Sequence, residues 1–449
     1  MRSGACGAAG AVILSAACAT HTALGACPPF PSPEPARESG VMASTFTGGL
    51  KRMPPPARHV PIPPGVFSSV KITFHRGSCL GSCPAYRVEI RGDGAVTFQG
   101  DADVLVLGKH SFRIPSETVQ CLLDDFRVAD FWSLRQNYVA PLTDSSLHQV
   151  TLQIDGRGKI LNDYVGEAVG MPPIVRALET AIDAAAANRF VRGDDHTLAT
   201  LQAERFNFKD EAGAAVLAHA AATGPDDLVL GLIAEGAPLR TQTSWKLPPP
   251  EKPAILSAAA RGRAQVVRAL IAAGALSEKG PNLKNDVYLA AAASLDDDTL
   301  VETLAVHPDI NARDTDGKTA LMPLEQDDQI APDQLARNGL RQVAIAKRLL
   351  ALGADSSLRN RSGGTALFYL AEPELVRLLV QAGTPLETRN DLGLTPLLSA
   401  TTDAAALALL EAGADPNAAD DDGDTVFKTA TTNKWGRTLA FLSAREAKP

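Results

Sequence analysis

A short apolar phrase ending in glycine recurs through the second half of the chain and limits the folds open to this half. Each copy has a Leu-Leu or Leu-Ile pair, two or three further residues, and the glycine. The copies lie at residues 232–237, 270–275, 349–355, 378–384 and 409–415, and in a sixth copy His307 replaces the glycine. Successive glycine positions are 38, 33, 46, 30 and 30 residues apart. A period near 33 residues is typical of stacked helical repeats.

Residues between these phrases indicate how each unit is built. Thr319, Thr365 and Thr395 are predicted to open first helices, because a threonine oxygen can accept an N–H of the first turn. The leucine pairs would pack the second helix against its neighbours, and the glycine would end it in a left-handed conformation. Asp or Asn followed by Gly, as at residues 314–317, 390–393 and 420–423, predicts hairpin turns between units.

Together these features resemble the ankyrin repeat family. The resemblance covers residues 194–449 and implies an all-α solenoid of about six units with a C-terminal cap around Val426 to Ala444. The histidine of the family's Thr-Pro-Leu-His phrase is absent. The unequal spacing predicts one insertion near Trp245–Pro253 and another near Glu325–Leu340.

Ankyrin arrays bind partners through their hairpin tips and the concave face of their first helices. The resemblance therefore implies a protein partner, with contacts at the tips and at an exposed inserted loop. The predicted contact residues are Trp245, Arg313, Asp314, Asn390, Asp391, Asp421 and Asp422. The acidic tips favour a basic partner, although for each tip residue taken singly a solvated turn is the favoured interpretation.

Residues 67–190 show a different pattern, in which apolar and polar residues alternate as in half-buried strands. One such run is residues 70–74. Residues 86–98 and 148–164 each read as a hairpin around an Asp-Gly turn. Helices are expected after Ser116 and from Pro173 to Ala187. The chain is thus predicted to be multidomain, with an α+β domain of mostly antiparallel sheet ahead of the repeats.

The most specific feature of this first domain is Cys79-Leu80-Gly81-Ser82-Cys83-Pro84-Ala85-Tyr86. Together with Gly92-Asp93-Gly94, Asp130-Phe131-Trp132 and Tyr138, it resembles a small bacterial domain family of unknown function that is sometimes joined to ankyrin repeats. The resemblance covers roughly residues 67–187 and implies no activity.

Cys79 and Cys83 can close a small loop if their Cα atoms come within about 4.4–6.8 Å of each other. A structural disulfide is favoured, since C-x-x-x-C lacks the spacing of thioredoxin-like centres and of most zinc knuckles. A redox-active pair, or a metal site completed by His75 and His148, stays open. Cys121 is expected to be unpaired, either as an exposed thiol or as a small buried side chain.

Residues 1–26 are predicted to be a lipoprotein-type export signal, with Arg2 ahead of a small-residue apolar run. Leu24-Gly25-Ala26-Cys27 resembles a bacterial lipobox, which implies a lipid on Cys27; Cys18 is the alternative, and cleavage without a lipid is a third reading.

Residues 27–66 are proline-rich and predict an extended linker. We expect an exported protein of the bacterial periplasm or outer membrane, held to the membrane only by lipid. A cytoplasmic adaptor with reduced cysteines is the alternative.

Charge and motifs narrow the function. The formal net charge is −8, and no basic stripe could follow phosphates, so a nucleic-acid partner is not expected. Hydrolase, phosphate-loop and dinucleotide signatures are missing. Asp144, His148, His110 and Tyr138 are the residues available for an acid–base cluster, but their spacing does not require them to meet.

We therefore predict no catalytic site, cofactor, metal or small-molecule substrate. The predicted function is non-catalytic binding of a protein partner in the cell envelope. The alternative is a redox or metal-dependent protein that uses Cys79 and Cys83, with the repeats as its targeting module.

Overall fold

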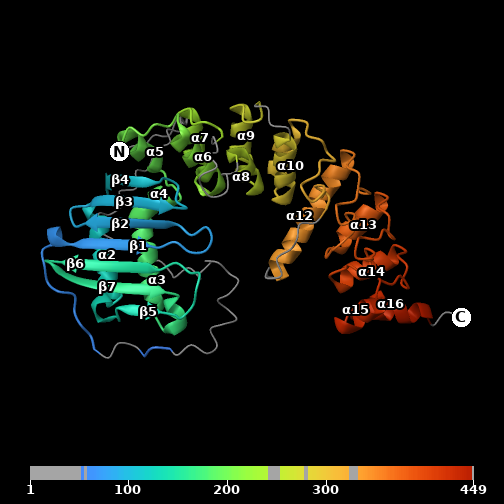
Figure 1. Cartoon of the computed structure of the whole chain (residues 1–449), viewed down its shortest axis with the longest axis horizontal. Coiled ribbons are helices and arrows are strands. Elements are labelled where there is room, and N and C mark those ends of the chain that lie inside the picture. The colour runs from blue at the N-terminus through green and yellow to red at the C-terminus, as the bar shows by residue number, and fades with distance from the viewer. Residues whose placement is uncertain (1–51, 55–57, 241–252, 278–281, 323–331, 447–449) are drawn as a thin grey trace, which may run out of the picture. The chain divides into compact units, whose positions relative to one another are not determined.

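A computed structural model describes residues 52–54, 58–240, 253–277, 282–322 and 332–446. The chain divides into two compact units (Figure 1). Unit 1 consists of the residues up to Ala102 together with Lys109–Ala187, and unit 2 of Asp103–Gly108 and the residues from Asn188 onward. Among the described residues, no helix has the length and apolar character needed to cross a membrane.

Unit 1 is built on a seven-stranded sheet with the strand order β4-β3-β2-β1-β6-β7-β5. The strands are β1 (Lys71–Arg76), β2 (Ala85–Arg91), β3 (Ala95–Ala102), β4 (Gly108–Arg113), β5 (Asn137–Val139), β6 (His148–Ile154) and β7 (Arg157–Tyr164). Strand β1 pairs antiparallel with β2 and β6, as do β2 with β3 and β6 with β7, whereas β5 pairs parallel with β7. The prediction of a mostly antiparallel sheet is confirmed.

Both predicted hairpins are present, and their turns explain them. Gly94 has φ 82° and Gly156 has φ 77°, which glycine adopts without steric cost. A Cβ added to Gly94 would lie 2.2 Å from the carbonyl oxygen of Ile114. Strands β4 and β5 were not predicted: β5 has only three residues, and the one buried position of β4 is a histidine, so neither shows apolar alternation.

One face of the sheet is buried and the other carries half-exposed polar side chains. Ile72 and Phe74 of β1 are fully buried, whereas Thr73 between them lies on the open face. Helices α2 (Ser116–Val128) and α3 (Pro173–Ile182) contact each other, and both are seen in Figure 1. The π-helical turn η5 (Asp183–Ala187) and α4 (Asn188–Val191) continue the helical run beyond the predicted end at Ala187. Short 3-10 turns are η2 (Phe67–Ser69), η3 (Phe131–Ser133) and η4 (Gly166–Val169).

Unit 2 is helical, which confirms the coarse prediction for the second half. Its further helices are α5 (Thr197–Ala203), α6 (Glu211–Thr223), α7 (Asp226–Ala234), α8 (Ala254–Ala260), α9 (Ala264–Ala272), α10 (Leu283–Ala293), α11 (Asp297–Leu304), α12 (Pro332–Ala351), α13 (Pro373–Gln381), α14 (Asp403–Glu411), α15 (Val426–Thr432) and α16 (Gly436–Glu446). Leu105 and Val106 belong here, because their N–H groups donate to the carbonyls of Val191 and Phe190.

The helices of unit 2 pack in two rows. Helices α6, α8 and α10 contact one another in succession, and so do α7, α9, α11, α12, α13, α14 and α16. Leu300, Leu349, Leu379 and Leu409 of the second row are fully buried. Each helix pair therefore relies mainly on its immediate neighbours for burial, as a repeat array requires.

No helix opens at Thr365 or Thr395, where first helices were predicted. Residues 319–322, 365–370 and 395–400 contain turns and no helix. After Thr365 and Thr395, α13 and α14 begin within eight residues, which leaves too little chain for a full first helix and the turn that follows it. The interpretation of Thr365 and Thr395 as helix starts is wrong, although their hydroxyl oxygens accept the N–H groups of Leu367 and Leu398 in the turns. The residues that follow Met322 after Thr319 lie outside the described part of the chain.

The glycines of the recurring phrase act as predicted. Gly236, Gly274, Gly353, Gly383 and Gly413 have φ between 82° and 103°. The residue after each glycine donates its N–H to a carbonyl five residues earlier, as Ala414 does to Leu409 at 3.0 Å. His307 holds the same left-handed position with φ 52°.

Several predictions fall outside the described residues. These are the leader at residues 1–26, both candidate lipid sites Cys27 and Cys18, and Trp245. The described end of the proline-rich stretch is hydrogen-bonded to unit 1: Met53 donates its N–H to the carbonyl of Val169, and Val60 to the hydroxyl of Ser133. Unit 1 thus begins before the predicted boundary at residue 67.

Candidate functional site

A cluster of charged side chains is buried between the sheet and α3 in unit 1. Arg176 of α3 lies among His148 of β6, Asp163 of β7 and Glu179, one turn further along α3. Side-chain exposure is 5% for His148, 1% for Asp163, 3% for Glu179 and 19% for Arg176. Burial of charged groups is costly unless they are paired, so each member depends on the others.

The distances show that Arg176 links the three other groups. Its Nη1 lies 2.9 Å from Glu179 Oε2 and 3.0 Å from His148 Nδ1, and its Nη2 lies 2.9 Å from Asp163 Oδ2. His148 Nδ1 is also 2.9 Å from Glu179 Oε2. The backbone N–H of Gly166 donates to Asp163 Oδ1 at 2.7 Å.

A second arginine extends the cluster toward the loop between β1 and β2. Arg76, the last residue of β1, lies 3.9 Å from Asp183 through its Nη1. Tyr86 of β2, opposite Arg76 in the ladder, donates its hydroxyl to Asp183. Asp183 begins η5, where the α-helix gives way to a π-helical turn. The β1–β2 ladder and the helical run are therefore joined through one carboxylate.

Burial dominates the protonation of this cluster. It raises the pKa of Glu179 to about 7 and, with the nearby charge of Glu179, the pKa of Asp163 to about 6. Burial also raises the pKa of Asp183 to about 6. In the opposite direction, burial and the charges of Arg76 and Arg176 lower the pKa of His148 to about 3. His148 is therefore neutral near pH 7.

The cluster contains the donor types of a metal site, but its geometry is that of an arginine site. One atom each from His148, Asp163 and Glu179 lies within 4.8 Å of the other two. The guanidinium of Arg176 contacts these same residues and places a positive charge where a cation would need to bind. These residues do not fit a metal ion while Arg176 holds this position.

Cys79 and Cys83 are joined by a disulfide, with Cα atoms 5.7 Å apart. The bond closes the loop between β1 and β2, where Leu80 is 78% exposed. In this state the two sulfurs cannot act as thiolate ligands with His75. Cys121 is also disulfide-bonded, so the prediction that it is unpaired is wrong. Cysteine spacing alone could not show that Cys121 is paired.

The residues considered for an acid–base cluster do not assemble into one. His110 lies on β4 and Tyr138 on β5, at opposite edges of the sheet. The hydroxyl of Tyr138 accepts the backbone N–H of Arg135. His148 contacts Glu179 and Arg176 instead of Asp144, which is exposed in a loop. The order of the strands in the sheet, which the sequence does not reveal, separates His110 from Tyr138.

In unit 2, four hairpin turns of the same build follow one another, and we call them the tip row: residues 314–317, 360–363, 390–393 and 420–423. The first residue of each turn, as Asp314 does, accepts backbone N–H groups through its side chain. Neighbouring tips also bond directly, since Arg361 donates its N–H to Asp316 and Asp391 to Ser362.

An arginine ladder runs beneath the tip row. Arg313 donates to the carbonyl of Arg359 at 2.9 Å, Arg359 donates to that of Arg389, and Arg389 donates to that of Ala419 at 2.8 Å. Each arginine directly precedes its tip and reaches the equivalent position of the next one. The predicted contact residue Arg313 therefore holds units in register.

The predicted tip contacts differ in their exposure. Asn390 is only 7% exposed, and its side chain accepts the N–H groups of Leu392 and Leu394, so it shapes the turn. Asp391, Asp421 and Asp422 are exposed. Within the part of the chain that the structure describes, these three carboxylates form no salt bridge. Leu392 between them is 67% exposed.

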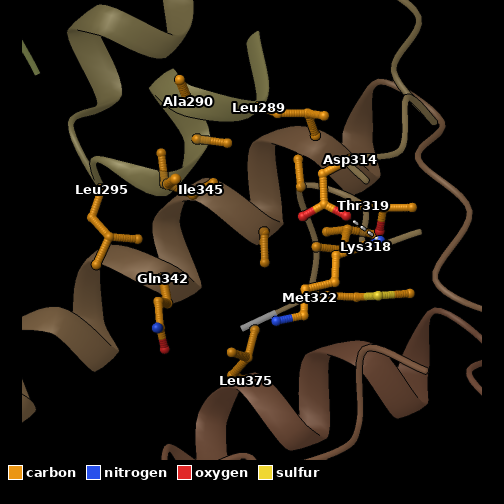
Figure 2. Close-up of a pocket in the computed structure, with 15 residues that line it drawn as sticks. Leu289, Ala290, Leu295, Asp314, Lys318, Thr319, Met322, Gln342, Ile345 and Leu375 are labelled. Carbon is orange, nitrogen blue, oxygen red and sulfur yellow. Dashed lines mark hydrogen bonds between the residues drawn. The ribbon is translucent and has the colours of Figure 1, made fainter. Parts of the chain in front are cut away.

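A pocket of about 230 Å³ opens beside the first tip (Figure 2). It is lined by α10, the turn that contains Thr319, α12 and Leu375 of α13. Figure 2 shows apolar side chains, among them Leu289 and Ile345, with Asp314, Lys318 and Gln342 as polar members. The turn at residues 319–322 forms one wall of the pocket, opposite residues of α10.

Sequence reasoning missed most of the buried cluster in unit 1. A signal was present: Arg176 and Glu179 are three residues apart in a helix whose other residues, except Thr180, are apolar, and the helix face they share is buried. Polar residues on an apolar face indicate internal partners. Asp163 could be placed opposite them only with the strand order in hand.

Comparison with protein families finds a match within unit 1. Residues 70–186 match a family described as a domain of unknown function, DUF6438, and the predicted resemblance of this region is confirmed. The matched region contains the whole buried cluster and the Cys79–Cys83 loop. No curated protein matches the chain.

Proposed function

We propose that unit 2 is an ankyrin-type repeat array that binds a protein partner, and that the tip row is its contact surface. The observation that carries this proposal is the row of exposed Asp391, Asp421 and Asp422 on turns held in register by the arginine ladder. A rigid row of like charges presents a surface without needing to be ordered on binding.

The charge of unit 2 supports a basic partner. Residues 188–449 hold 27 Lys and Arg against 35 Asp and Glu, whereas residues 1–187 hold 16 of each. The net charge of −8 thus arises from residues 188–449. An acidic surface speeds the encounter with a basic segment and disfavours acidic competitors.

The pocket in Figure 2 suggests how such a segment would be anchored. A basic, extended segment that follows the tip row would pass Asp314, which also lines the pocket. An apolar side chain of that segment would fill the space beside Leu289 and Ile345. Buried apolar anchors flanked by charged contacts are the usual source of affinity at such surfaces.

An exported location for this binding protein remains part of the proposal. Disulfides persist in oxidising compartments, and the Cys79–Cys83 bond agrees with export. No observation favours redox or metal chemistry at these cysteines over a structural bond.

The test compares charge at the tips with charge elsewhere on unit 2. The triple variant Asp391→Asn, Asp421→Asn, Asp422→Asn is compared with a control, Asp227→Asn, Asp286→Asn, Asp298→Asn, which removes three exposed carboxylates from helices. Both variants and the wild type are used to isolate proteins from a cell-envelope extract. We expect a basic protein that binds the wild type and the control, and binds the tip variant at least tenfold more weakly. Equal binding by all three would overturn the tip row as the contact surface.

A further inference from the structure

The buried cluster of unit 1 holds more carboxyl groups than cations. Its members are Arg76 of β1, Tyr86 of β2, His148 of β6, Asp163 of β7, Arg176 and Glu179 of α3, and Asp183 of η5. Glu167 of η4 lies 4.0 Å from Arg176 Nε but is 45% exposed, so water screens it. With His148 neutral, the buried members would carry two positive and three negative charges.

Two oxygen atoms in this cluster lack a hydrogen bond, and they belong to neighbouring carboxyl groups. Glu179 Oε1 and Asp163 Oδ2 are buried and make none within the described residues, although Arg176 Nη2 forms an ion pair with the latter. The two residues belong to a group whose donor atoms lie within 4.8 Å of one another. Two ionised carboxylates in such a place repel each other, and one proton removes the repulsion.

We propose that Asp163 and Glu179 share one proton in the folded domain, and that this proton makes the stability of unit 1 depend on pH near neutrality. The proton lies between Glu179 Oε1 and Asp163 Oδ2 and supplies the hydrogen bond that both oxygens lack. It also balances the two arginines against the three carboxyl groups. The raised pKa values of both residues agree with this assignment.

The direction of the pH effect follows from proton binding. In the unfolded chain both carboxyl groups lose their protons near pH 4, whereas the folded pair keeps one until pH approaches 7. Between these limits the folded state binds more protons than the unfolded state, so its stability falls as pH rises. Above pH 7 the folding constant of unit 1 levels off at its low value, because neither state then holds the proton.

Glu179→Gln in the full chain tests the shared proton. A glutamine amide can donate to Asp163 in place of the proton, and it cannot titrate. The readout is urea-dependent hydrogen exchange of peptides from β1 and β6, from pH 5 to pH 8. In the wild type the folding constant should fall by up to about tenfold per pH unit between the unfolded and folded pKa values, and in the variant this slope should decrease by about one proton. Glu167→Gln, the exposed carboxyl beside Arg176, is the control and should keep the wild-type slope.

Two outcomes would overturn the proposal. One is an equal slope for wild type and Glu179→Gln. The other is a Glu179→Gln chain that loses protection in β1 and β6 at pH 5, since this would mean that the ionised form of Glu179 is needed.

Infrared spectroscopy gives a readout that does not depend on stability. The difference spectrum between wild type and Glu179→Gln at pH 6 should contain the carbonyl band of a protonated carboxyl group. Subtraction removes other protonated groups such as Asp125, whose pKa burial raises to about 6. Absence of this band at pH 6 would also overturn the shared proton.

Discussion

The two units keep their charges in different places. Unit 1 has 16 basic and 15 acidic residues and buries several of them beneath α3, where Arg176 contacts three partners. Unit 2 has 27 basic and 36 acidic residues, and its ion pairs include exposed ones such as Arg348 with Asp297. Buried charges tie distant strands and helices into one cooperative structure, whereas exposed charges leave each repeat to depend on its neighbours. The units should therefore respond differently to the same kind of substitution.

The largest expected effect is the loss of the buried arginine. Arg176→Met removes the cation and leaves Asp163 and Glu179 buried together, which should cost about 3–5 kcal/mol. In unit 2, Arg348→Met breaks an ion pair whose side chains are 41% and 45% exposed and should cost about 0–1 kcal/mol. Chemical denaturation of both variants measures the difference. Similar losses at the two sites would contradict the distinction between buried and exposed charges.

A leucine truncation in each unit sharpens the contrast in cooperativity. Leu152 in β6 and Leu379 in α13 are both fully buried, and each change to alanine should cost about 2–5 kcal/mol. Hydrogen exchange should show lost protection across the whole sheet for Leu152→Ala. For Leu379→Ala the loss should be confined to α12, α13 and α14, because repeats contact only their neighbours. Loss throughout unit 2 would show that it folds as one cooperative body.

Removal of the loop disulfide should have a smaller effect, limited to unit 1. Cys79→Ser with Cys83→Ser opens a loop of only five residues, and a closure this short stabilises by about 2 kcal/mol. Thermal unfolding of the double variant should show a lower transition for unit 1 and an unchanged one for unit 2. A shift in both transitions would indicate coupling between the units.

The smallest effect, which is also a stabilising one, is expected just after the end of α11 in unit 2. His307 occupies a left-handed position that is filled by glycine in the other copies. His307→Gly should stabilise unit 2 by about 0.5–1 kcal/mol, the strain of a side chain at positive φ less the entropy of glycine. The same substitution at His110, which lies in a strand, should destabilise unit 1.

The sequence predicted regular features well, because they depend on local chemistry. The Asp-Gly pairs predicted the turns of both hairpins, and the recurring glycine predicted where the second helices end. In the copy that lacks the glycine, His307 holds the same left-handed position. The sequence did not predict the turns after Thr365 and Thr395, since the number of residues available for a helix depends on where the next helix begins.

The buried cluster was largely beyond prediction for a different reason. Sequence spacing places His148 among the candidates for an acid–base cluster with His110 and Asp144, because spacing along the chain does not show the order of the strands. Its true partners, Arg176 and Glu179, meet it only because α3 crosses β6 and β7. The match to a family of unknown function adds no residue roles that could have supplied this pairing.

The arginine ladder affects how further units could be added to this region of the protein by duplication. Each arginine donates forward to the equivalent position of the next unit, and the ladder ends at Ala419, where that position has no arginine. An in-frame duplication of residues 384–413 would add a second copy of Arg389. The carbonyl of this copy would accept from the arginine of the unit before it, and its guanidinium would donate to the carbonyl of Ala419. Every bond of the ladder would be preserved, so unequal recombination could lengthen this array without a compensating mutation.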